Sequence, residues 1–265
     1  MTVAATVERI CDQVGHRLPK LAIVLSTGLQ AVDGDVEGPA IFSYADLPGF
    51  PTTAVPSHVG RLLVGKLAGH SVALLESHDD YYAAGRIDAM REPLAVAAGL
   101  GCDKVLITAA AHSLRADLSP GQLVLVTGHL ALGDPAALAA GLGSQYPVDW
   151  HAAYDAVLNE RLRLAAAHIE TPLAEGRFAW PASETAPIAA AREQGADMIG
   201  RALIAEAVIA RALGLRVAAL ANIIDWAPGF APAGVSPDLA RQRADFAAIH
   251  LRRLLADYLE HGGAD

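Results

Sequence analysis

Short apolar runs alternate with segments of helical periodicity along the whole chain. The run Leu21–Leu25 is apolar at every position and enters a Ser-Thr-Gly turn, which predicts a buried strand. Residues 61–67 and 70–76 flank an Ala-Gly connection and predict a β-hairpin. Residues 104–109 and 216–221 are further apolar runs, and we expect them to form buried strands as well.

Between these runs the apolar positions recur at the spacing of amphipathic helices. The segments with this spacing are residues 2–15, 88–100, 150–168, 199–213 and 238–261. We expect Asp88 to cap the second of them, because Asp is a preferred residue before the first helical turn. Residues 131–149 and the stretch IIDWAPGFAPAG are rich in Gly, Pro or Asp and predict loops.

This alternation of strands and helices predicts an α/β fold with a mixed central sheet. We find no shift in composition that would mark a linker and no internal repeat, so we expect one domain over residues 1–265.

Composition excludes several classes of protein. Hydrophobic residues make up 53% of the chain and charged residues 18%, which argues against a disordered protein. The net charge of -9 comes without an evident basic face, so we expect no nucleic-acid partner. No run of ~18 apolar residues predicts a membrane span. The two cysteines are far apart and show no metal-ligand spacing, which favours free thiols in a cytoplasmic protein and no metal.

Polar turns follow four of the apparent strands. They read LSTG, LESHDD, TAAAHS and PASET, and the second contains His78 and Asp80. Strand ends are where α/β proteins place their ligands, so we expect the four turns to line one pocket. The sequence contains neither GxxxxGK[ST] nor GxGxxG.

These turns, taken in order, resemble the trimeric purine nucleoside phosphorylases over roughly residues 20–260. VLSTGL is similar to the phosphate turn of that family, and PTTAVPSHVGRL to its Pro-x-His-x-Gly-Arg-Leu segment. WPASET resembles Gly-Pro-Ser-Phe-Glu-Thr, and GADMIGRALIAE resembles Gly-Ala-Asp-x-Val-Gly-Met-Ser-x-x-x-Glu. The resemblance implies a distorted barrel, a homotrimer with active sites near subunit interfaces, and displacement of a purine from ribose by phosphate, without a cofactor.

The resemblance also implies which residues hold the phosphate ion. Thr27 takes the place of a turn hydroxyl, His58 matches a phosphate-site histidine, and Ala110 offers a backbone N–H. His78 stands where the family has an arginine, and Asp80 stands where it has a histidine. An imidazole lacks the two-pronged, permanently charged contact of a guanidinium, so these replacements weaken phosphate binding.

A further replacement lies later in the chain. Ala202 stands in place of a hydroxyl that binds phosphate in the family, next to Arg201, where the family has methionine. Arg201 restores part of the lost attraction if its side chain turns into the pocket; otherwise it is a surface or interface residue.

The purine position is better preserved, whereas the ribose pocket has lost partners. Glu184 matches the glutamate that holds the purine N1–H, and Asp225 takes the place of the residue that contacts N7. Burial of Asp225 would let it carry a proton and donate it to N7. Tyr82 matches a ribose-side tyrosine, while Ser183 replaces a phenylalanine. His112 occupies a glycine position of the family, and we interpret it as structural.

Three functions remain open at this point. The first is a phosphorylase of purine nucleosides in which His58, His78 and Arg201 bind the anion. The second is a nucleoside hydrolase in which Asp80 and His78 activate water in the volume that phosphate vacates. The third is a catalytically weakened relative that binds a nucleoside.

Overall fold

The computed structural model describes residues 2–15, 18–26, 28–52, 60–77, 86, 88–132, 153–181, 188–232 and 246–263. The strands among them are β1 Leu21–Leu25, β2 Glu37–Ser43, β3 Arg61–Leu67, β4 His70–Glu76, β5 Lys104–Ser113, β6 Leu123–Leu132, β7 Ala174–Pro181, β8 Met198–Ile199 and β9 Arg216–Trp226. The helices are α1 Val3–Val14, α3 Arg91–Gly99, α5 Ala156–His168, α6 Ile188–Glu193, α7 Ile204–Ala212 and α9 Phe246–Tyr258. Short helical turns are η1 Gln30–Asp35, η2 Tyr44–Asp46 and η4 Leu259–Gly263.

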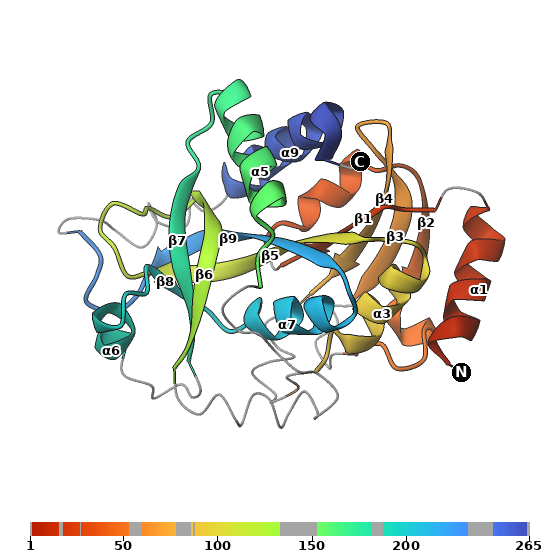
Figure 1. Ribbon diagram of the computed structural model, residues 1–265, viewed down its shortest axis with the longest axis horizontal. Coiled ribbons are helices and arrows are strands. Elements are labelled where there is room, and N and C mark those ends of the chain that lie inside the picture. The colour runs from red at the N-terminus through yellow and green to blue at the C-terminus, as the bar shows by residue number, and fades with distance from the viewer. Residues whose placement is uncertain are drawn as a thin grey trace.

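The described strands form one sheet that closes on itself at one end. Their order is β2-β3-β4-β1-β5-β8-β7-β6-β9, and β9 also pairs with β5. Strands β5, β8, β7, β6 and β9 therefore make a closed barrel, and β1, β4, β3 and β2 extend it as an open sheet. Figure 1 shows this curved sheet with α5 and α9 on one side and α7 and α3 on the other. The predicted α/β fold with a distorted barrel is confirmed.

Strand β1 is apolar at every position, as expected for a strand whose two faces are both covered. In β1, all five residues are buried. Ala22 and Val24 point into the core under α1, α3 and α7, and Leu21, Ile23 and Leu25 into the core under α5 and α9. A parallel strand covered on both sides has no solvent face, so its sequence lacks the alternation of a half-exposed strand.

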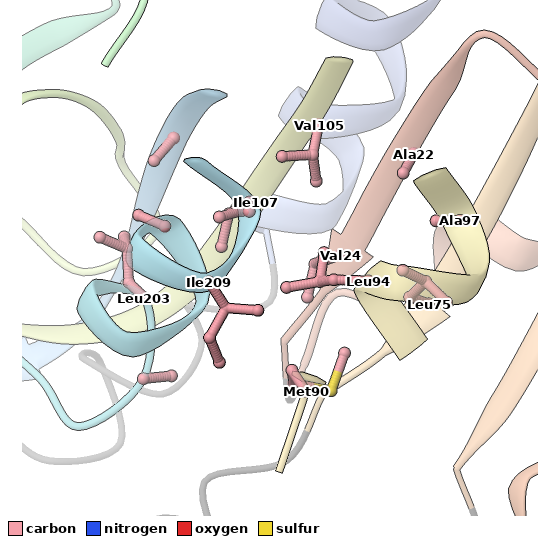
Figure 2. Close-up of a cluster of buried hydrophobic side chains, with 14 of the residues drawn as sticks. Ala22, Val24, Leu75, Met90, Leu94, Ala97, Val105, Ile107, Leu203 and Ile209 are labelled. Atoms are coloured by element: carbon pink, nitrogen blue, oxygen red, sulfur yellow. The ribbon is translucent and has the colours of Figure 1, made fainter. Parts of the chain in front are cut away.

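The helices α3 and α7 cover the first of these cores. Figure 2 shows Leu94 and Ala97 of α3 and Ile209 of α7 directed at side chains of β1 and β5, such as Val24 and Ile107. All five of these side chains are buried. None of the helices in the described ranges is long and apolar enough to cross a bilayer.

The helix α5 covers the other face, and Asp155 is the residue directly before its first turn. The Asp155 carboxylate accepts hydrogen bonds from the backbone N–H groups of Val157 and Leu158, which makes it an N-cap. The same carboxylate lies 2.8 Å from Nε of Arg216 at the start of β9. This interaction is the main reason that the pKa of Asp155 falls to about 2. One side chain thus starts the helix and ties it to the barrel.

Several element boundaries differ from the sequence-based expectation. Helix α3 begins at Arg91, and no side chain caps it, because residues 88–90 form a separate turn. Asp88 instead lies 3.4 Å from the guanidinium of Arg91. The expected helix over residues 150–168 begins at Ala156, and the expected helix over residues 238–261 is described from Phe246. The antiparallel edge strand β2 was not predicted.

Two strands run further than their sequences suggested. The stretch TAAAHS was expected to be a turn, and IID the start of a loop, but both belong to strands. Strand β5 pairs with β9 from Lys104↔Arg216 to Ser113↔Trp226, with an irregularity after Ala111. The small residues of β5 let the two backbones stay paired up to the end of the barrel, so the predicted turns became part of its wall.

The expected helix over residues 199–213 is divided by a close backbone contact. Met198 and Ile199 form strand β8, and α7 begins only at Ile204. Between them, a Cβ on Gly200 would lie 2.6 Å from the carbonyl oxygen of Ala110 and 2.6 Å from the Phe178 ring. Glycine is needed here because the chain passes directly over the end of β5.

We predict that Gly200→Ala destabilises the protein by about 1–3 kcal/mol, because the added methyl group forces the backbone of β8 away from β5. Urea unfolding would measure this as a lower midpoint with an unchanged slope. Gly34→Ala is the matched control, since nothing lies within 4 Å of a Cβ at that position. Equal midpoints for the two variants would contradict the close approach.

We predict a pH-dependent loss of stability in Asp155→Asn, which keeps a capping oxygen but removes the charge. The pKa of Asp155 is lowered from 3.8 to about 2, so its ion pair stabilises the fold above pH 4 and is lost as the pH falls toward 2. The Arg216 side chain is partly exposed, and we expect a difference of roughly 1–2 kcal/mol at neutral pH. Urea unfolding of both proteins across this range would test it. A difference that stays constant below pH 4 would exclude this assignment.

Candidate active site

The C-terminal ends of four neighbouring parallel strands form one edge of the sheet, called the strand edge below. Strands β4, β1, β5 and β9 are neighbours and run in the same direction. The residues after β1 and β4 are tied together, because the backbone N–H of Ser77 donates to the carbonyl of Leu25 at 2.8 Å. The N–H of Ser26 donates to the Thr108 hydroxyl of β5 at 2.9 Å. The turns that contain Thr27 and His78 therefore start from adjacent positions, as ligand-binding turns of α/β sheets do.

The turn after β1 depends on a glycine. Gly28 has a φ of +88°, a conformation that side chains disfavour. Its N–H donates to the side-chain oxygen of Gln30 at 2.8 Å. Thr27 lies between Ser26 and Gly28 and is outside the described residues.

The segment that precedes β3 is held against the end of β4. Tyr44 donates its hydroxyl hydrogen to the carbonyl of Glu76 at 2.9 Å, and its N–H to the carbonyl of Gly60. A Cβ on Gly60 would lie 2.3 Å from the Tyr44 ring, so only glycine fits there. Arg86 donates to the carbonyl of Thr52 at 2.8 Å. One of the stretches between these residues carries His58 and the other carries His78. The contacts bring the ends of the two stretches together. Both histidines are outside the described residues.

Two carboxylates form ion pairs with Arg61 at the strand edge. The Arg61 guanidinium lies 2.6 Å from both Glu76 and Asp33. The hydrogen bond to Glu76, followed by the other charges, raises the pKa of Arg61. Glu76 is the last residue of β4 and is buried. Because Arg61 is already paired with two carboxylates, its charge is largely neutralised before an anion arrives.

A buried carboxylate supports the turn after β4 from the other side. Glu206 lies in the first turn of α7 and is fully buried. It accepts a hydrogen bond from the Ser77 hydroxyl at 2.5 Å. Carboxylates are favoured at helix N-termini, and this one fixes the residue directly before His78. The sequence showed Glu206 only as the end of a family motif and suggested no role for it.

Three of the predicted site residues lie at or near the C-terminal end of β5. In the pairing with β9, Ala110 faces Asn222 and His112 faces Asp225. The close contact of Gly200 with Ala110 places Arg201 at the same end. Ala110, Asp225 and Arg201 therefore lie near the same end of β5, and their roles in a site stay predictions.

His112 lies among these residues and was interpreted as structural from the sequence. Partial burial is the main cause that lowers the pKa of its ring; Asp225 acts in the opposite direction and Arg201 in the same direction. The imidazole is therefore neutral at pH 7 and sits within the electrostatic reach of both groups. His112 faces Asp225 in the pairing of β5 with β9, and its structural interpretation stays a prediction.

Asp225 also differs from expectation, because it is exposed rather than buried. Its Oδ1 accepts a hydrogen bond from the N–H of Trp226 at 2.8 Å, which fixes the direction of the carboxylate. Asp225 is the residue before the last one of β9. The burial that the sequence argument required is not found.

The other predicted site residues are outside the described part of the chain. They are Thr27, His58, His78, Asp80, Tyr82, Ser183 and Glu184. The residues that flank them are described and lie at the strand edge or, for the last two, next to β7 and α6. Their assignments stay predictions.

Comparison with known proteins agrees with this architecture. Residues 20–260 match the family model described as the phosphorylase superfamily. The chain is 32% identical to a purine nucleoside phosphorylase of Mycobacterium leprae over 255 residues, 94% of this chain and 92% of that one. It is 28% identical to purine nucleoside phosphorylase 1 of Bacillus subtilis, covering 83% of this chain and 84% of that one.

Solved structures show the same fold. A Schistosoma purine nucleoside phosphorylase in complex with hypoxanthine superposes with a TM-score of 0.81, covers 98% of each chain and is 21% identical. Sequence, fold and strand-edge geometry thus agree, and the chain belongs to the phosphorylase superfamily and, within it, to the purine nucleoside phosphorylases.

Proposed function

We propose that this protein is a purine nucleoside phosphorylase that cleaves the N-glycosidic bond of a purine nucleoside with phosphate. The observation that carries the proposal is the similarity to curated purine nucleoside phosphorylases over 94% of the chain. The adjacent C-terminal ends of β4, β1 and β5 support it, because three of the four turns that resemble the family follow or end these strands.

The reaction makes three demands on the site. Phosphate must be held below the ribose, the sugar must pass through a cationic transition state, and the departing purine must be stabilised as it gains negative charge. We assign the first role to Thr27, His58, His78 and the N–H of Ala110. Tyr82, Ser183 and Arg201 would contact the ribose side.

Two carboxylates and a neutral imidazole would stabilise the leaving purine. We assign Glu184 to the N1 side and Asp225 to N7. His112 adds a ring at the position where the family has glycine, next to Asp225, so it narrows the base end of the pocket. A neutral imidazole there can accept or donate one hydrogen bond to a purine edge.

Anion binding differs from the family pattern. Arg61 is engaged by Glu76 and Asp33, so positive charge for the phosphate has to come from elsewhere. Arg201 lies next to Gly200 near the end of β5, and burial and then the charge of Arg201 lower the pKa of His112. We propose that Arg201 and the histidines replace the family arginine, with weaker phosphate binding as the result.

The remaining parts of the proposal concern the setting of the reaction. We propose that phosphate is the only co-substrate and that no cofactor takes part. A cytoplasmic homotrimer, with neighbouring subunits next to each site, agrees with the family resemblance. Purine salvage is the process such an activity would serve.

We predict that the protein releases free base from purine nucleosides only when phosphate is present. Inosine, adenosine and guanosine would be incubated with and without phosphate, and base release followed by chromatography. Release without phosphate would replace the proposal by a hydrolase. Thermal stabilisation by a nucleoside without any release would replace it by a binding protein.

We predict that His78→Arg lowers the KM for phosphate by about 10–100-fold, because a guanidinium adds a charge-assisted hydrogen-bond pair. His70→Arg is the matched control: it makes the same change at the opposite end of β4, about 20 Å from the strand edge. Steady-state kinetics with varied phosphate would measure both. A similar KM change in the two variants would show that His78 does not face the phosphate site.

A further inference from the structure

Three potential metal ligands meet where α5 and the C-terminal segment come together. His168 is the last residue of α5, Asp257 lies in the last turn of α9, and His261 lies in η4. One donor atom from each lies within 4.8 Å of the others. Nδ1 of His168 contacts Oδ1 of Asp257, and Nδ1 of His261 lies 3.4 Å from the same oxygen.

The carboxylate at the centre of this cluster is buried. Asp257 is 6% exposed, whereas both histidine side chains are more than half exposed. The second oxygen, Oδ2, is buried and has no hydrogen-bond partner among the residues that the structure describes. A buried oxygen that carries charge is costly unless a hydrogen bond or a cation compensates it.

A cavity next to the cluster gives a ligand room. Its volume is ≈ 340 Å³, and it is lined by the three ligand residues together with Arg161, Leu164 and Tyr258, among others. The cavity is large enough to hold an ion and several waters.

The helix ends around the cavity favour a cation. Helices α5 and α9 both end here, and the C-terminal end of a helix carries partial negative charge. Arg161 carries a like charge, but its guanidinium donates to the carbonyl of Gly262 and so holds the turn that contains His261. The arginine reduces the affinity for a cation and at the same time orders one of its ligands.

We propose that His168, Asp257 and His261 bind a divalent transition-metal ion of the zinc type. Nδ1 of His261 donates to the backbone carbonyl of Asp257 at 2.9 Å, so Nε2 is the nitrogen of this ring that is left for a metal ion. His168 completes the set by rotating its exposed ring away from Oδ1. Water in the cavity fills the remaining position.

The donor set selects the ion. Two imidazole nitrogens and one carboxylate suit Zn²⁺ and its neighbours in the transition series, whereas Ca²⁺ and Mg²⁺ prefer oxygen ligands. The proposal is independent of the proposed function. Helices α5 and α9 cover the face of the sheet opposite α7, whose first turn supports the active-site edge, as Figure 1 shows.

The test is titration of ZnCl₂ into untagged full-length protein after removal of metals with EDTA, followed by calorimetry. We expect saturation at one ion per chain at pH 7.5. His168→Ala, His261→Ala and Asp257→Asn should each weaken binding at least about tenfold, since each removes one ligand. MgCl₂ should give no saturable heat.

His250→Ala is the matched control. It removes a histidine of α9 that lies seven residues, or about 10 Å, before Asp257 and outside the cluster. If Asp257→Asn does not fold, the two histidine variants carry the test, because their side chains are exposed. Failure of the wild type to bind Zn²⁺ saturably would overturn the proposal. So would wild-type affinity in both histidine variants.

Discussion

The pairing of β5 with β9 is the constraint on which the rest of the structure depends. It closes the barrel, and it continues beyond the expected strand ends to His112 and Asp225. Next to this pairing, Gly200 lets the chain cross directly over Ala110, because a Cβ there would lie 2.6 Å from the Ala110 carbonyl oxygen.

The charged residues at the strand edge are already paired with one another, and this pairing limits the positive charge available to an anion. Glu76 and Asp33 engage Arg61, and Glu206 is fixed by Ser77. These interactions make the edge rigid without leaving it strongly positive. Under the proposed function, an anion held there would depend mainly on backbone N–H groups, imidazoles and Arg201, which is a weaker arrangement than a dedicated guanidinium. The family relationship and the altered anion chemistry are therefore compatible, since a fold persists while single side chains at its site change.

The two faces of the sheet serve different purposes. The core under α3 and α7 is continuous with the supports of the candidate site, because Glu206 belongs to α7. The core under α5 and α9 reaches the buried Asp257. Asp155 joins the beginning of α5 to the beginning of β9, while the end of α5 meets the C-terminal turn. An ion bound at that end would stabilise the attachment of the C-terminal segment without touching the residues of the strand edge.

The sequence by itself determined the fold class, the family and the central strands. The continuous apolar run of β1 and the hairpin of β3 and β4 are local patterns, and a strand buried on both faces can be recognised from its own residues. The order of the motifs predicted that their turns share one edge of the sheet. Ala110, Arg201 and Asp225 lie near the end of β5, and their roles as site residues stay predictions.

Only the tertiary structure decided where β5 and β9 end, whether Asp225 is buried, and which residues surround His112. A run of small residues reads locally as a turn, and its pairing partner lies more than a hundred positions away. Ser77 and Glu206, and likewise His168 and Asp257, are also far apart in the sequence. Such features depend on which segments the closed barrel brings together, and no local pattern of residues contains that information.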